Sequence, residues 1–203
     1  DATYSYSQAA YCQGDANQTP TITGDAGGAF TSSPGGLTIS GAGVITPGTS
    51  TPGTYNVLYT TPGTDPCFDT LTVQVTINAD QDGTFTYPQA AYCEDDVDPT
   101  PTITGTGAGN FTAPGAVVID LNSGVIDLSA STAGGPYTIT YTTPGPCAGI
   151  GTFDITINAL DDPAFSYSAA TYCQSDAVQS PTVTGLGGGT YSFVLTSGAG
   201  PTL

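Results

Sequence analysis

Cysteine is the residue type in this chain with the clearest capacity for chemistry. There are five cysteines, and four of them form two pairs at nearly equal spacing: Cys12 with Cys67, and Cys93 with Cys147. This spacing predicts one disulfide within each of two repeated units and leaves Cys173 to a partner beyond this sequence. A disulfide closing a loop of this length contributes about 3–4 kcal/mol by the chain-entropy relation. Paired cysteines indicate an oxidising, extracytoplasmic compartment.

The cysteines allow two other interpretations. Buried free thiols are an alternative, because unpaired cysteine often serves as a small apolar core residue. A zinc site has little support, since the sequence holds no Cys-x-x-Cys pair and no histidine. The disulfide interpretation is therefore preferred.

Carboxylates are the other chemically active groups. The chain has 17 Asp and Glu residues but no Lys, Arg or His, so its formal charge is −17. Several aspartates gather where repeated units join, and hard carboxylate oxygens there suit Ca²⁺, which would stiffen the joint and relieve like-charge repulsion. The predicted calcium ligands are Asp80, Asp82, Asp96, Asp161, Asp162 and Asp176. The alternative is that these aspartates form turns; Asp15, Asp96 and Asp176 would then bond local backbone three residues after a cysteine.

The composition also excludes several function classes. Without His, Lys or Arg, neither a Ser-His-Asp triad nor a Cys-His pair can form, and no carboxylate pair stands out as catalytic. The chain is therefore predicted not to be an enzyme, and to require no cofactor. Nucleic acid is not an expected partner, because nothing in the chain could replace the counterions on phosphate.

The whole chain is built on a repeat of about 80 residues. The segment Tyr4–Cys12 recurs as Phe85–Cys93 and as Phe165–Cys173, and a Pro-Thr-x-Thr-Gly block follows each of them. Such self-similarity is typical of modular arrays. The predicted modules are residues 1–79, 80–159 and 160–203, the third one partial.

Within each repeat, apolar residues alternate with polar ones, which indicates β-strands. The clearest case is the run 71–77, in which every second residue is Leu, Val or Ile. No helical periodicity is present. The predicted fold is all-β, with tandem antiparallel immunoglobulin-like sandwiches of six to eight strands. The strands expected in the two full repeats are 3–7, 20–24, 36–40, 43–46, 54–61 and 69–78, then 84–87, 101–105, 116–121, 124–128, 136–142 and 152–158.

The predicted disulfide pairing conflicts with the plainest form of the predicted fold. In a plain Greek-key sandwich, the first and last loops lie at opposite poles. Cys12 follows the first strand and Cys67 precedes the last, so a bond between them requires the chain after Ser7 to double back or the strand order to differ.

The strand motifs carry a resemblance. The blocks Gly36–Ser40, Gly43–Ile45 and Thr51–Val57 resemble the pattern of bacterial immunoglobulin-like adhesin repeats, and the Tyr-Cys-x-x-Asp opening is similar to repeats in giant cell-surface proteins of Bacteroidota. Proteins of that family are exported by the type IX route, and some are gliding-motility adhesins. The resemblance covers essentially the whole chain. It also implies an O-glycosylation site at Thr70, because Asp69-Thr70-Leu71 is similar to the Asp-Ser/Thr-aliphatic site of that group.

The predicted function is a non-catalytic structural stalk in a filament of a large, acidic, secreted surface adhesin. Its expected location is extracellular, on a bacterial cell surface. The expected partners are neighbouring repeats of the same chain, other copies in a filament, and a surface or glycan target reached by a tip outside this sequence. The alternatives are a carbohydrate- or ice-binding extracellular module and a self-assembling filament or sheath subunit.

Overall fold

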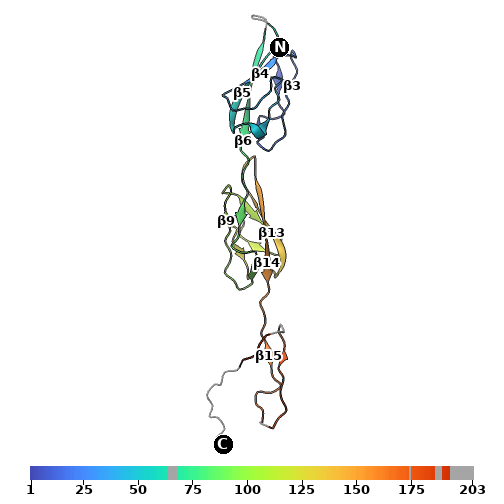
Figure 1. The fold of residues 1–203 in the computed structure, drawn as a ribbon, viewed down its shortest axis with the longest axis vertical. Coiled ribbons are helices and arrows are strands. Elements are labelled where there is room, and N and C mark those ends of the chain that lie inside the picture. The colour runs from blue at the N-terminus through green and yellow to red at the C-terminus, as the bar shows by residue number, and fades with distance from the viewer. Residues whose placement is uncertain (64–67, 174, 186–188, 193–203) are drawn as a thin grey trace.

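The computed structural model describes residues 1–63, 68–173, 175–185 and 189–192, and it shows an all-β chain arranged as a row of units (Figure 1). Within those residues the only helical element is a single 3-10 turn, η1 (Pro47–Thr49). None of the described segments is a helix of the length and apolarity needed to cross a membrane.

The first sandwich has one four-stranded sheet, in the order β2-β6-β5-β4. The two long strands, β5 and β6, pair antiparallel along their whole length, as the alternation of apolar residues predicts. The opposite face is a short pair, β1 with β3, extended by isolated bridges from Ile45 to Gln18 and Ile39. The strands are β1 (Tyr4–Ser5), β2 (Ala10–Cys12), β3 (Thr21–Ile22), β4 (Ala29–Ser33), β5 (Gly53–Thr60) and β6 (Thr70–Asn78).

The second sandwich repeats this plan with the sheet order β10-β13-β14-β8. Its other face consists of two short pairs, β7 with β9 and β11 with β12. The strands are β7 (Phe85–Thr86), β8 (Ala91–Cys93), β9 (Thr102–Ile103), β10 (Asn110–Thr112), β11 (Val118–Ile119), β12 (Ile126–Asp127), β13 (Gly134–Thr142) and β14 (Ile150–Asn158). The third unit shows one strand pair in its described residues, β15 (Phe165–Ser166) with β16 (Thr182–Val183).

The all-β sandwich prediction is confirmed, with one refinement. Two short strands that the alternation did not reveal, β2 and β8, pair parallel to the last long strand of their sandwich. In the first sandwich, the strands expected at 36–40 and 43–46 form only isolated bridges, from Ile45 to Ile39 and to Gln18. The segment after Ser7 therefore does turn aside to join the main sheet.

Each sandwich encloses its own aromatic core. Tyr4, Phe30 and Tyr59 pack against one another in the first, and Phe85, Phe111 and Tyr141 occupy the matching places in the second. Ring pairs in such tilted and edge-to-face arrangements contribute about 0.5–1.5 kcal/mol each beyond the area they bury. With no Trp or Met in the chain, tyrosine and phenylalanine supply the large core volume.

Buried tyrosine hydroxyls in these cores have polar partners. Tyr4 donates to the carbonyl oxygen of Val57 at 2.6 Å, and Tyr141 donates to that of Thr106 at 2.9 Å. Burial raises the pKa of Tyr4 to about 12, because the low-dielectric core disfavours the phenolate. The hydroxyls therefore tie the ring cores to the backbone of loops and strands at neutral pH.

Candidate functional site at the sandwich junction

The junction between the first two sandwiches is crossed by a disulfide. Cys12 of the first sandwich is bonded to Cys147 of the second, with their Cα atoms 5.5 Å apart and a sequence separation of 135. The Cα separation lies inside the range that disulfides require. The junction is therefore joined covalently twice, once by the main chain and once by this bond.

Strand register explains why these two cysteines meet. In the first sandwich the parallel pairing of β2 with β6 sets Cys12 opposite Asn78, the last residue of β6. Cys147 lies just before β14, at the start of the last strand of the second sandwich. Because the units follow one another in a row (Figure 1), the end of one last strand faces the beginning of the next.

The predicted pairing within each repeat was wrong. Cys93 stands opposite Asn158 at the end of β14, whereas Cys147 precedes the start of that strand. Nine strand residues at about 3.3 Å each separate the two cysteines by roughly 30 Å, far beyond disulfide reach. Cys12 is likewise bonded to Cys147 and not to Cys67, which lies outside the described residues. Among the described cysteines, Cys93 and Cys173 are unbonded.

Hydrogen bonds on the linker reinforce the joint. Gly14 donates its backbone N–H to the Asp80 carboxylate at 3.1 Å. On either side, the Gln13 N–H donates to the Asn78 carbonyl at 3.0 Å, and the Gln81 N–H donates to the Cys147 carbonyl at 3.0 Å. The linker is thus bonded to the loop that follows Cys12 and to Cys147 itself, so the two covalent crossings lie side by side.

The predicted calcium ligands are not gathered at one place in the described structure. In the part of the chain that the structure describes, one group of three potential ligands lies within 4.8 Å: Cys12, Asp80 and Cys147. Its two sulfur atoms are joined in the disulfide and offer no thiolate to a metal. Asp161 is exposed to solvent. Calcium binding at these residues stays a prediction.

The other aspartates of that set form turns, as the alternative interpretation proposed. Asp96 accepts the Cys93 N–H at 2.7 Å and Asp176 accepts the Cys173 N–H at 2.7 Å, and Asp15 does the same for Cys12 at 2.9 Å. These carboxylates fold the chain back just after each cysteine. They therefore fix the backbone of the turn that follows each cysteine.

Asp82 and Asp162 make a second kind of turn at the start of their units. Asp82 accepts hydrogen bonds from the hydroxyl and the N–H of Thr84, and these bonds, the hydroxyl first, lower the pKa of its carboxyl group. Asp162 accepts the N–H of Ala164 at 2.9 Å, and alanine offers no hydroxyl. The turn is thus kept in the third unit with one donor fewer.

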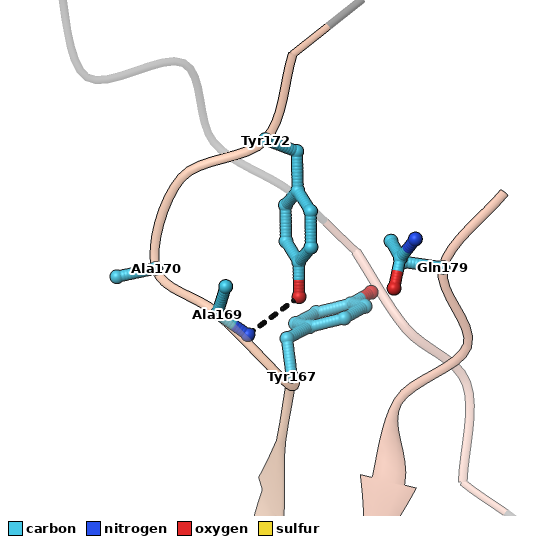
Figure 2. Close-up of a pocket in the computed structure, with 5 residues that line it drawn as sticks. All are labelled: Tyr167, Ala169, Ala170, Tyr172 and Gln179. Carbon is cyan, nitrogen blue, oxygen red and sulfur yellow. Dashed lines mark hydrogen bonds between the residues drawn. The ribbon is translucent and has the colours of Figure 1, made fainter. Parts of the chain in front are cut away.

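A surface hollow of about 560 Å³ lies in the third unit, lined by Tyr167, Ala169, Ala170, Tyr172 and Gln179 (Figure 2). Inside it the Ala169 N–H donates to the Tyr172 hydroxyl at 2.7 Å. The same bond joins Gln8 to Tyr11 in the first sandwich, where Tyr11 is only 1% exposed, against 40% for Tyr172. The hollow therefore corresponds to the part of the core that the long strands cover in a full sandwich. The exposed rings of Tyr167 and Tyr172 do not by themselves indicate a ligand site.

Thr70, the predicted glycosylation site, is the first residue of β6 and is exposed. Its N–H donates a local hydrogen bond to the Asp69 carboxylate at 3.2 Å. Modification of this residue stays a prediction.

Comparisons with known proteins address the fold. No protein-family model matches the sequence, and no curated protein matches it either. Among solved structures, the chain is similar to mouse cadherin-23 repeats EC22–24 at 15% identity, with 92% of this chain and 80% of that chain covered and a TM-score of 0.37.

Two further structures show the same kind of likeness. They are protocadherin gamma B2 extracellular cadherin domains 3–6 (13% identity, 91% of this chain, 56% of that chain, TM-score 0.35) and Sidekick-1 immunoglobulin domains 1–4 (11%, 77%, 48%, TM-score 0.40). The chain spans about half the length of these two structures. All three TM-scores lie below 0.5, so these likenesses define neither a family nor a function for this chain.

Proposed function

We propose that this chain is a non-catalytic, load-bearing stalk segment of an extracellular adhesin. The observation that carries the proposal is the disulfide between Cys12 and Cys147. A second covalent crossing at a module junction restricts bending and twisting, which a spacer needs and a freely jointed set of binding modules does not. Residues 1–79, 80–159 and 160–203 would be its successive modules.

The chemistry of the chain supports an extracellular location. A disulfide between modules persists in an oxidising compartment and is reduced in most cytosols. The absence of Lys, Arg and His removes the usual catalytic bases and every cleavage site for trypsin-like proteases. Both properties suit a long polymer exposed outside a cell.

The finer assignment rests on the sequence resemblance. Repeats of giant Bacteroidota adhesins share the strand and Tyr-Cys motifs, so we propose a type IX-exported surface filament, of the kind used in gliding motility, with its adhesive target bound by a tip outside these residues. Self-association into filaments, Ca²⁺ at the junctions and a glycan on Thr70 belong to the same proposal.

Immunogold electron microscopy of intact source cells tests the stalk. An antibody raised against residues 1–159 should label thin surface filaments at intervals along their length. Label in the medium, or scattered over cells without filaments, would contradict the stalk and favour the carbohydrate- or ice-binding module. A glycan-array screen of the same fragment then serves as the second measurement, for which the stalk proposal expects no specific binding.

A further inference from the structure

Tension applied to the ends of this chain has two covalent routes through the first two sandwiches. We propose that the Cys12–Cys147 disulfide makes the shorter route the load-bearing one, so that residues 13–146 are shielded from stretching. The inference rests on the proposed stalk function for its biological meaning, although the mechanical behaviour follows from connectivity alone. The short route consists of residues 1–12, the disulfide, and the chain from Cys147 onward.

The first part of this route crosses from the short strand pair to the main sheet of the first sandwich and is anchored in both. Its β1 pairs with β3, and its β2 pairs parallel with β6. The side chains of Tyr4 and Tyr11 are buried in the core, and Tyr4 also donates a hydrogen bond to Val57. Tension on residues 1–12 therefore acts on a short run of chain, whose complete release would add no more than about 40 Å.

In the second sandwich the route is a single strand. The load enters at Cys147, follows β14, and leaves at its last residue, Asn158. A β-strand already rises about 3.3 Å per residue, close to the fully extended limit of roughly 3.6 Å. Pulling on the two ends of β14 thus gains almost no length, and there is little drive to remove the strand from the sheet.

Neighbouring strands on both sides hold β14 in place. It lies inside the sheet, between antiparallel β13 and parallel β8. Its inward-facing Ile155 and Ile157 are fully buried in the core. The load-bearing strand is therefore paired along both edges and anchored in the core of the second sandwich.

Without the disulfide the load must take the long route. Tension would then pass from the first sandwich through the linker 79–82 and into the second, so each sandwich would be stretched between its own two ends. Unfolding would release the residues that the bond encloses, about 450 Å of chain at roughly 3.4 Å per residue. The bond thus converts two extensible modules into a nearly inextensible unit.

Single-molecule force spectroscopy on the whole chain tests this inference. Handles are attached through terminal peptide tags, not through thiols, and the chain is stretched first in non-reducing buffer and then in dithiothreitol. The non-reduced chain should show no step from the first two sandwiches longer than about 40 Å. The reduced chain should show two additional steps of about 250 Å each, one per sandwich. Residues beyond Asn158 extend equally in both buffers, so they do not contribute to the difference between the two force curves.

Two variants serve as controls. Cys147→Ser without reductant should reproduce the two long steps, and Cys93→Ser should behave as the unmodified chain, because Cys93 is unbonded in the described structure. If Cys147→Ser does not fold, reduction of the unmodified chain after folding gives the same comparison. Two long steps in the non-reduced, unmodified chain would overturn the inference. That result is independent of the cell-surface imaging, so the two proposals can fail separately.

Discussion

The two junctions of this chain follow the same plan but show different contacts among the described residues. At the first, the disulfide and the linker cross side by side, and the Asp80 carboxylate accepts the Gly14 N–H. At the second, Cys93 occupies the place of Cys12, and no bond from it is seen among the described residues. A carboxylate is again used there, now in the reverse direction: Glu94 accepts the N–H of Leu160 at 3.4 Å.

The units that follow the two junctions differ in a related way. The described third unit keeps the local hydrogen bonds of the motif, including the Asp176 turn and the pairing of β15 with β16. Burial is different: Phe85 is 4% exposed in the second sandwich, and its counterpart Phe165 is 49% exposed. The opening motif therefore encodes its own turns, whereas the core and the covalent joint depend on strands and cysteines from elsewhere in the chain.

The largest expected effect comes from removing the disulfide at the first junction. Cys147→Ser opens a loop whose ends are separated by 135 positions in sequence, and the chain-entropy relation puts the loss at up to about 5 kcal/mol. We expect the unfolding midpoint to fall by at least about 5 °C in differential scanning calorimetry.

Cys93→Ser is the matched control for that experiment and should leave the midpoint within about 1 °C. Native-state alkylation adds a check, because Cys93 and Cys173 should react with iodoacetamide while Cys12 and Cys147 stay protected. Equal destabilisation by Cys93→Ser and Cys147→Ser would restore the pairing within the repeat.

Core substitutions sharpen the comparison between the second and third units. Phe85→Ala removes a buried ring that packs edge-to-face on Phe111 and Tyr141, and we expect a loss of about 3–5 kcal/mol. Phe165→Ala at the matching, half-exposed position should cost less than about 1 kcal/mol. Urea denaturation followed by tyrosine fluorescence measures both. A large loss from Phe165→Ala would show that the third unit has a closed core in solution.

Much of the fold could be predicted from the sequence, because long strands leave a clear pattern. The alternation in 71–77 identified β6 correctly, and the matching segments identified β5, β13 and β14. The three-residue strands β2 and β8 were missed, since Ala-Tyr-Cys is too short to alternate. These are the strands that pair parallel to the last strand and carry Cys12 and Cys93.

The prediction of which cysteines pair was wrong for a related reason. Equal spacing within each repeat favoured bonds inside the repeat, but spacing along a chain says nothing about which pole of a sandwich a residue occupies. One signal in the sequence could have corrected this prediction: in a plain sandwich, the loops that hold Cys12 and Cys67 lie at opposite poles and cannot be bonded to each other. In a row of units, the end of one last strand faces the start of the next, so that conflict disappears if the bond is made between neighbours.

The smallest expected effect concerns the turn aspartates at the two junctions. The hydroxyl and N–H of Thr84 lower the pKa of Asp82, so the folded state holds the ionised carboxylate more tightly than the unfolded chain does. This stabilisation is present above the unfolded pKa of about 3.9 and is lost as the pH falls through the lower, folded value. Thr84→Ala copies the arrangement of Asp162 with Ala164 and removes the hydroxyl bond. We expect the Asp82 pKa to move up toward its ordinary value, measured by the carboxyl-carbon chemical shift in an NMR titration from pH 7 to 2.

Thr84→Ser keeps a hydroxyl at the same position and should preserve the lowered pKa. If both variants titrate like the unmodified chain, the Thr84 hydroxyl does not hold this turn, and the first turn of the second sandwich would then be no firmer than that of the third unit.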